Sequence, residues 1–212
     1  MESIKINISR GSGKMIGMSS INSNTLTNPY CKKCKYFKTK KIAKTSGAKY
    51  PICYSAYQLM TYRITAINSY QHNSEVLSKS IIDTNDLPRI YDTKYMRINS
   101  HGELINMIHL INIVNIVKKN HDIEYGLWSK RYDLIYKYFK RNEMPKNLYM
   151  IFSNSEINKP MNKIPKYFHK TFNNITKDNL KDKDKINCDM KCSECLLCYT
   201  KNNVDHIVEY LK

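Results

Sequence analysis

Between about residue 94 and residue 175, strand-like and helix-like segments alternate, and this alternation restricts the chain to few architectures. Residues 104–119 carry apolar side chains at helical spacing, and residues 132–140 are long enough for a second helix. A strand–helix–strand order predicts right-handed βαβ units and a parallel sheet. The strands are expected at residues 95–100, 123–129, 148–153 and 170–175, the last least clearly because no helix is evident before it.

The predicted fold is therefore α/β, either a partial (β/α) barrel or an open parallel sheet of about four strands. A length of 212 residues with 42% hydrophobic residues is sufficient for one domain with a real core. Within that domain, residues 94–180 are expected to form the βα core and residues 181–212 a cysteine-rich tail.

The residues before this core divide into two predicted segments. Residues 1–54 lack clear periodicity and are expected to be irregular, with a short strand at 4–8 and a turn at 10–14 that lacks P-loop spacing. Residues 55–93 are expected to be helical as far as about Lys79, before Pro88 interrupts the chain. One apolar stripe of this helix is expected to face the core, formed by Tyr57, Met60, Ile64, Ile67 and Tyr70.

Polar side chains follow three of the predicted strands at the point where each strand ends. Because the carboxyl ends of parallel strands meet at one edge of a sheet, these groups are expected to share a pocket for an anionic small ligand. The candidate residues are Ser100, His101, Glu103, Lys130, Arg131 and Asn154. The alternative is that βα turns are polar in any case, with Ser100 and Glu103 forming a capping box at a helix start.

Seven cysteines are the most specific chemical feature of the chain. No signal peptide and no apolar run long enough to span a bilayer is evident, so a soluble intracellular protein is expected, in which disulfides are rare. Four cysteines lie within eleven residues near the end of the chain, and three lie near its beginning. This pattern predicts a metal centre whose ligands are Cys31, Cys53, Cys192, Cys195 and Cys198, with Cys34 and Cys188 less certain.

Two kinds of metal centre fit these spacings, and reduced thiols without metal are a third alternative. An iron–sulfur cluster, [4Fe–4S] above all, fits Cys192-x-x-Cys195-x-x-Cys198, with Cys53 or Cys31 as the remote ligand. Zinc fits two separated Cys-x-x-Cys pairs, here Cys31/Cys34 and Cys195/Cys198. Either centre would join the two cysteine-bearing ends of the chain and couple metal binding to folding.

The charge balance raises the expectation of a polyanionic partner. The chain carries 35 basic and 18 acidic residues, a formal net charge of +17, which favours contact with nucleic acid or another polyanion. Against this, the lysines are spread along the sequence, and a composition rich in Lys, Asn and Ile is typical of an AT-rich genome. No membrane association is expected.

Several motifs, in this order, resemble those of the bacteriophage "gene product eighty-eight" family, from about residue 10 to residue 200. They are Gly13-Lys-Met-Ile-Gly17, Asn28-Pro-Tyr-Cys31, Cys53-Tyr-Ser55, Ile98-Asn-Ser-His-Gly-Glu-Leu104, Leu127-Trp-Ser-Lys-Arg131 and Cys195-Leu-Leu-Cys-Tyr199. The resemblance implies a phage protein with a cysteine-bearing, barrel-like βα core, located in the cytoplasm of the infected host cell. The family has a further cysteine where this chain has Lys49-Tyr-Pro-Ile52, whereas Cys34 is additional here.

The same family is similar, more distantly, to the radical S-adenosylmethionine enzymes. In these enzymes three cysteines leave one iron of a cluster open to the cofactor, and Cys188-x-x-x-Cys192-x-x-Cys195 has their spacing but closes the chain. They also hold the methionine amino group with a Gly-Gly-Glu-like turn, and residues 100–103 occupy a comparable place. The resemblance therefore implies S-adenosylmethionine as a candidate cofactor.

Three functions follow from these observations. The first is an iron–sulfur protein with redox or radical chemistry in the strand-end pocket. The second is a zinc- or cluster-stabilised phage protein that binds nucleic acid. The third is a protein that contacts a host component and in which the metal only holds the fold. The sequence identifies no substrate and does not decide between an enzyme and a binding protein.

Overall fold

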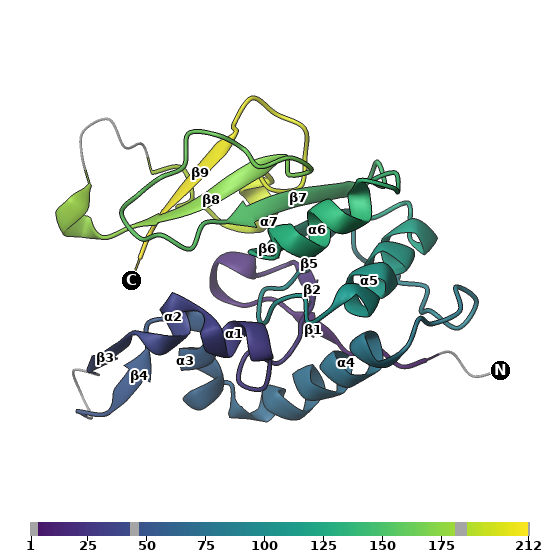
Figure 1. Ribbon diagram of the computed structural model, residues 1–212, viewed down its shortest axis with the longest axis horizontal. Coiled ribbons are helices and arrows are strands. Elements are labelled where there is room, and N and C mark those ends of the chain that lie inside the picture. The colour runs from purple at the N-terminus through teal and green to yellow at the C-terminus, as the bar shows by residue number, and fades with distance from the viewer. Residues whose placement is uncertain (1–3, 43–46, 181–185, 212) are drawn as a thin grey trace.

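A computed structural model describes residues 4–42, 47–180 and 186–211, and its main feature is a seven-stranded sheet (Figure 1). The strand order is β1-β2-β5-β6-β7-β8-β9; β1 and β2 are antiparallel, and every pair from β2 to β9 is parallel. The strands are β1 Ile8–Arg10, β2 Ser19–Ile21, β5 Tyr95–Ile98, β6 Glu124–Ser129, β7 Leu148–Ser153, β8 Lys170–Ile175 and β9 His206–Tyr210.

The helices divide into those that cover the sheet and those that carry the cysteines. The covering helices are α4 Ile67–Lys79, α5 Met107–Lys119 and α6 Tyr132–Phe139. The cysteine-bearing segments contain α1 Pro29–Lys33, α2 Lys35–Lys38, α3 Tyr54–Met60 and α7 Cys192–Cys195, together with a hairpin of β3 Lys40–Ile42 and β4 Lys49–Pro51. Short 3₁₀ turns occur at Gly13–Met15, Ile64–Ala66 and Lys177–Asn179.

Each parallel crossover joins neighbouring strands, so α4, α5 and α6 pack against one side of the sheet, the outer face (Figure 1). Leu77 of α4, Leu110 of α5 and Leu134 of α6 belong to one buried cluster with side chains of β2, β5, β6 and β7. Burial of this apolar surface is the main stabilising contribution to the fold. The sheet ends at β1 on one side and β9 on the other, so it is open rather than a closed barrel.

The period-two alternation of the strands sends the remaining side chains to the opposite, inner face. In β6, Tyr125 and Leu127 join the outer cluster, while Trp128 packs on the inner face with Tyr199 and Met18. Gly126 permits this packing, because a β-carbon there would collide with Trp128 and approach Tyr199. The inner face is therefore covered by the tail and by residues near the start of the chain instead of by helices.

The predicted parallel α/β sheet is confirmed, and β7 and β8 have the predicted bounds. The expected number of about four strands was wrong, because β1, β2 and β9 extend the sheet to seven. β9 lies in the stretch expected to be only a tail, and β1 and β2 lie in the segment expected to be irregular. The predicted strand at 4–8 is displaced to Ile8–Arg10, and the turn at 10–14 is confirmed by the 3₁₀ turn.

The single helix predicted to run as far as Lys79 was also wrong. It is divided at Thr61 into α3 and α4, and Met60 and Ile64 of the expected core stripe are 43% and 58% exposed. Tyr70 of the same stripe is buried. The apolar spacing continued across the break by chance, since Thr61 adopts a non-helical backbone conformation there.

Candidate functional site

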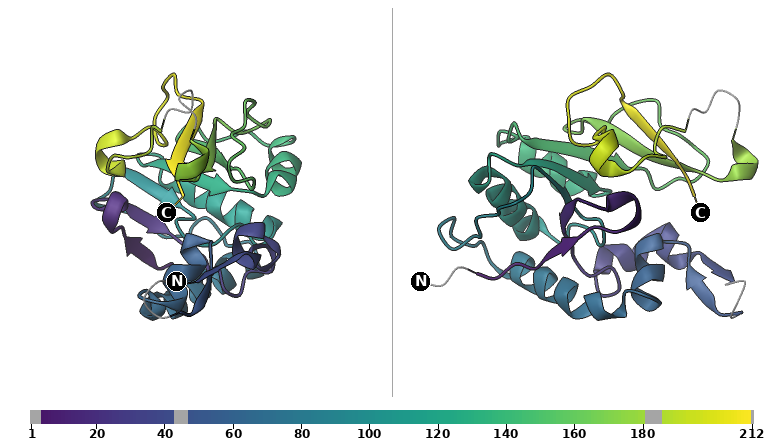
Figure 2. Two further views of the ribbon diagram at one scale, coloured as in Figure 1. Left: turned by 90° about the vertical axis from the view of Figure 1, so that its left-hand side faces the viewer. Right: turned by 180° about the vertical axis from the view of Figure 1, so that it is seen from behind.

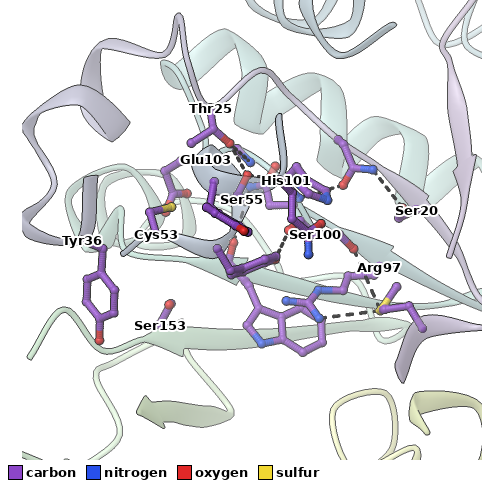
Figure 3. A pocket seen from close by; sticks show the side chains of 18 of the residues that line it. Ser20, Thr25, Tyr36, Cys53, Ser55, Arg97, Ser100, His101, Glu103 and Ser153 are labelled. Carbon is purple, nitrogen blue, oxygen red and sulfur yellow. Dashed lines mark hydrogen bonds between the residues drawn. The ribbon is translucent and has the colours of Figure 1, made fainter. Parts of the chain in front are cut away.

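A cavity of about 600 Å³ lies along the inner face and the carboxyl edge of the sheet. Its walls come from the first strands, the α1–α3 segment, the loops after β5 and β6, and the tail. Figure 3 shows Cys53, Ser55, Ser100 and His101 around part of this cavity, with Arg97 farther along. Six of the seven cysteines line it, namely Cys31, Cys34, Cys53, Cys188, Cys192 and Cys198.

The loop after β5 is held tightly against the loop after β2. Gly102 has a φ of +86°, and a β-carbon at this position would overlap Ser23, so only glycine fits. The amide of His101 donates to Asn22 Oδ1 at 2.9 Å, and the Tyr54 hydroxyl donates to the Ser100 carbonyl oxygen. These contacts fix the strand-end polar groups in place.

His101 is buried in this loop. Its Nδ1 atom lies 2.9 Å from the Ser55 hydroxyl, which in turn contacts the Thr25 hydroxyl. The ring lies against Tyr54 and Tyr70. Burial, followed by the nearby arginine charges, lowers the pKa of His101 to about 3. Burial thus favours the neutral imidazole, and the contacts of the ring with Ser55, Tyr54 and Tyr70 hold the loop in place.

Glu103 joins the ends of β5 and β6. Its carboxylate accepts hydrogen bonds from the Ser129 hydroxyl at 2.7 Å, the Lys130 amide at 2.7 Å and the Leu104 amide at 2.8 Å. Burial raises the pKa of Glu103, although these hydrogen bonds oppose the shift. The alternative of a capping box was wrong, because α5 begins at Met107 and is capped by Asn106.

Lys130 projects from the end of β6 toward the N-terminal cysteines. Its Nζ donates to Ser153 Oγ at 2.7 Å and to the Ser153 carbonyl oxygen at 3.0 Å, and lies 5.0 Å from the centre of the Tyr36 ring. Burial lowers the pKa of Lys130, while the Cys34 thiol and other nearby acidic groups, including Cys53 and Cys31, act in the opposite direction. The ammonium group thus lies close to all three N-terminal thiols.

Cys31, Cys34 and Cys53, here called the N-terminal cysteine group, come from consecutive short elements. Asn28 caps α1 by accepting from the Cys31 amide, Cys34 lies between α1 and α2, and Cys53 precedes α3. The pKa of Cys31 is raised well above its usual range by burial, and then by the Glu103 carboxylate and the other two thiols. The three thiols are therefore close enough to interact electrostatically.

Cys188, Cys192, Cys195 and Cys198, here called the tail cysteine group, lie between β8 and β9. Burial raises the pKa of Cys188 to about 12, and the Glu209 carboxylate adds to this shift. Burial also raises the pKa of Cys198, against the effect of the Arg97 charge, and the other three tail thiols raise it further. Figures 1 and 2 show α7 on one side of the molecule and α1 and α3 on the other.

The cysteines therefore form two groups along one cavity. The predicted combination of Cys53 or Cys31 with the tail cysteines stays a prediction, and members of both groups line the same cavity. Within residues 4–42, 47–180 and 186–211, no three His, Cys, Asp or Glu side chains are arranged to hold a single metal ion. All seven cysteines are free thiols.

Unpartnered polar atoms gather around the cavity. Among the described residues, six buried side-chain nitrogen or oxygen atoms lack a hydrogen-bond partner. Four of them belong to residues that line the cavity, namely Arg63 Nε, Arg97 Nε, Asn99 Oδ1 and Trp128 Nε1. Buried polar groups are normally paired, so this concentration indicates a site that a polar ligand completes.

Arg97 is the most exceptional of these residues. It lies on the inner side of β5, with its guanidinium carbon 3.9 Å from the centre of the Trp128 ring and Nη1 3.7 Å from the Met15 sulfur. No Asp or Glu in the described part of the chain forms an ion pair with it. Arg97 is half-buried and lines the cavity, so its guanidinium group is available to an anion there.

Four of the six predicted pocket residues, Ser100, His101, Glu103 and Lys130, line the cavity. The other two are in structural positions outside its wall. Arg131 donates to the Leu104 and Ile105 carbonyl oxygens, and Asn154 binds the chain around residues 156–161. Residues missed at the sequence level are Arg97, Asn99, Tyr54 and Lys14. A basic residue between apolar neighbours in β5 was the available signal for Arg97.

The fold and the cavity define an open, parallel α/β protein with two cysteine groups on the inner face of its sheet. A sequence model of the family described as gene product 88 matches residues 9–207, so the chain belongs to this phage gene-product family. No curated protein and no solved structure matched the chain. Within the described residues, none of the helices has the length and apolar character needed to cross a bilayer.

Proposed function

We propose that this protein binds an iron–sulfur cluster through Cys31, Cys34 and Cys53, and that redox or radical chemistry on a small polar ligand takes place in the adjoining cavity. The observation that carries the proposal is that Cys31, Cys34, Cys53 and Lys130 line one cavity at the carboxyl edge of a parallel sheet. This edge is where parallel α/β folds place their reactive groups. The reducing cytoplasm of the infected host cell would keep the cysteines as thiols.

The donor set fits a cluster with three protein ligands. Soft thiolates suit iron–sulfur clusters, and each thiolate binds a different iron, so the sulfur atoms need not converge on one point. A cluster held in this way supplies one-electron transfer and an iron position at which a ligand can bind. Lys130 would offset the negative charge of the three thiolates, and Tyr36 and Ser153 hold the lysine in place.

The cavity wall suits a ligand that carries both an amino group and an anionic group. Asn99 Oδ1 is a free acceptor and Arg63 Nε a free donor, and both residues line the cavity. Basic side chains outnumber acidic ones in the wall, where Glu103 and Glu209 are the described acidic residues. S-adenosylmethionine has an amino group, a carboxylate and an adenine, and we propose it as the compound to test first.

The experiment that tests cluster binding is purification without oxygen, followed by iron and sulfide analysis and electron paramagnetic resonance of the reduced protein. The variant with Cys31→Ala, Cys34→Ala and Cys53→Ala should lose the signal of a cluster at this site. The matched control, Lys32→Ala with Lys33→Ala in the same helix, should retain it, since both lysines are exposed. A colourless protein with stoichiometric zinc, or an unchanged signal in the triple variant, would overturn the proposal.

Ligand binding is tested separately by adding S-adenosylmethionine to the loaded protein. The resonance signal of the N-terminal cluster should change, and Asn99→Gly should weaken this response by about tenfold, as expected for one lost hydrogen bond in a desolvated site. Asn158→Gly is the control, because Asn158 has the same positive φ but lies outside the cavity wall. An unaltered signal at saturating concentration would exclude this compound as the ligand.

A second candidate function is polyanion binding, and one observation favours it. Residues 3–74 contain no Asp or Glu, and the segment from α1 to β4 presents exposed lysines on one lobe of the fold. The lysines are therefore less evenly spread than the whole sequence suggested. They are Lys32, Lys33, Lys35, Lys38, Lys40, Lys41 and Lys49.

A salt-dependent mobility shift with single-stranded and duplex nucleic acid tests this function. Lys38→Glu with Lys40→Glu should reduce binding and lower the salt dependence. Lys118→Glu, which changes an exposed residue of α5, should have a smaller effect. No shift at low salt would exclude nucleic acid as a partner.

A further inference from the structure

We propose that the tail cysteine group is a second, separate iron–sulfur site, in which Cys188, Cys192, Cys195 and Cys198 supply all four ligands. The site would need no ligand from the N-terminal group, which would retain three thiolates and one open position. The proposal does not depend on the function of the N-terminal site. It rests on the backbone of the tail, on the contacts that anchor it and on its surrounding charges.

The backbone of the tail folds its cysteines into one short, compact segment. Cys192 and Cys195 lie one turn apart on α7, and Leu196 then adopts the left-handed conformation, with a φ of 52°. The amide of Leu196 donates to the Cys192 carbonyl oxygen, and the amide of Tyr199 donates to the Leu196 carbonyl oxygen. This reversal returns the chain toward α7, and Cys192 and Cys198 pack against the same apolar cluster, which contains Trp128 and Tyr199.

The fourth cysteine is held by the opposite end of the chain. Lys14 Nζ donates to the Cys188 carbonyl oxygen at 2.6 Å, lies 4.0 Å from its sulfur and pairs with Glu209 at 2.5 Å. On the other side of the loop, Lys170 is buried and donates to Asn202 Oδ1 at 2.7 Å. Two lysines from distant parts of the sequence thus fix a segment that has little regular structure of its own.

The sheet side of the tail group is also closed. Tyr199 is 1% exposed and packs with its ring centre 5.7 Å from that of Trp128. Cys192 and Cys198 contact the same apolar cluster. The four tail cysteines are half-buried, and the apolar cluster excludes water from the sheet side of the group, where an assembled cluster would be held.

Charge supplies the independent argument. Arg97 lies over the ring of Trp128, which belongs to the apolar cluster that Cys192 and Cys198 contact. Its buried Nε has no partner, and it forms no ion pair with a carboxylate among the described residues. Four thiolates outweigh the positive charge of the iron–sulfur core, so the assembled centre is an anion. Such a centre would provide the counter-ion that Arg97 lacks, with Lys14 as a second nearby cation.

Iron analysis of two matched variants tests the proposal. One carries Cys31→Ala, Cys34→Ala and Cys53→Ala; the other carries Cys192→Ala, Cys195→Ala and Cys198→Ala. Each should bind about half the iron of the wild type, a loss of about four irons per chain for a [4Fe–4S] site. The two variants should lose different resonance signals, and the signals that remain should add up to that of the wild type.

Two outcomes would overturn the second site. The tail variant could retain the full iron content, or either variant could lose all the iron, which would indicate one shared centre. If only the tail variant binds less iron than the wild type, the result would support the tail site and contradict the proposed N-terminal cluster. The converse pattern, in which only the N-terminal variant loses iron, would support the proposed function and refute this inference.

A milder variant covers the case in which the tail triple variant does not fold. Arg97→Gln keeps every cysteine and should lower the reduction potential of the tail centre, because a positive charge beside the anionic site is removed. The N-terminal signal should titrate as in the wild type. If each of the two signals has the same reduction potential in Arg97→Gln as in the wild type, no centre lies beside Arg97.

Discussion

The two faces of the sheet differ in how completely their side chains are satisfied. The outer face is covered by three helices and packed with apolar side chains that are almost fully buried, such as Ile113 and Leu110. The inner face carries a cavity, unpartnered polar atoms and two groups of cysteines. The comparison separates the face that holds the fold together from the face on which polar groups remain unpartnered. Among the described residues, four of the six unpartnered buried polar atoms belong to residues that line the cavity, and the Tyr125 hydroxyl is the one in the outer cluster.

The largest effect should come from opening a cavity in the outer core. Ile113→Ala should lower the free energy of unfolding by about 2–5 kcal/mol, since Ile113 is fully buried. Ile81→Ala removes the same atoms from a side chain that is 59% exposed and should change stability little. Urea unfolding measures both, and the iron bound per folded chain should be equal in the two variants. A selective loss of iron in Ile113→Ala would mean that the two faces are not separable.

A smaller effect on stability should follow from protonation on the outer side. Burial lowers the pKa of His109, on α5, from 6.5 to about 4. The unfolded chain therefore binds this proton more readily than the folded chain between these pH values, and stability falls as pH decreases through them. At pH 5 the loss from this group is about 2 kcal/mol relative to pH 7.

Urea unfolding of the metal-free protein at pH 7 and pH 5 measures this loss. His109→Asn keeps an acceptor for the Ile105 amide, which donates to His109 Nδ1 at 3.2 Å, but removes the titration. The difference in stability between the two pH values should be smaller in the variant by about 2 kcal/mol. An equal difference in variant and wild type would show that His109 does not titrate in this way.

A third effect, about 1 kcal/mol, should change sign with metal content. In metal-free protein, Arg97→Met removes a buried charge without a counter-ion and should leave stability unchanged or increase it by this amount. In loaded protein the same change removes a favourable interaction and should make iron easier to chelate. Parallel unfolding and chelation measurements test both halves. Destabilisation of the metal-free form would indicate that Arg97 is already paired.

The smallest effect is optical. Trp128 is the single tryptophan, and it lies in the same apolar cluster as Cys192 and Cys198. A coloured centre at the tail thiols would absorb the energy of its emission, so tryptophan fluorescence should be weak in the loaded protein and increase on chelation. The tail variant should show a larger increase than the N-terminal variant. An equal increase in emission in the tail variant and the N-terminal variant would show that the metal is not bound beside Trp128.

The sequence predicted the part of the fold that repeats a simple pattern. β7 was found because its apolar residues 148–152 follow a helix-like segment, whereas β8 was the least clear strand because no helix precedes it. The polar residues after β5 and β6 follow from the geometry of parallel sheets. The short strands β1, β2 and β9 were missed because they have only three to five residues and depend on pairing with a neighbour.

The arrangement of the cysteines could not be deduced from spacing. Judged by spacing alone, Cys53 and Cys188 could both be ligands of one shared centre. Only the fold shows that α3 and α7 lie in different parts of the molecule. Arg97 was accessible in principle. It alternates with Met96 and Ile98, which belong to the outer cluster, so its side chain had to emerge on the other face.

The order of the strands has a consequence for how the protein is made. From β2 to β9 the spatial order is the order of synthesis, so each strand can pair with its predecessor as the chain leaves the ribosome. The N-terminal cysteines emerge long before the sheet edge that they face. The tail cysteines emerge just before β9, the strand that completes the sheet. The two cysteine groups therefore reach their full surroundings only when β9 completes the sheet.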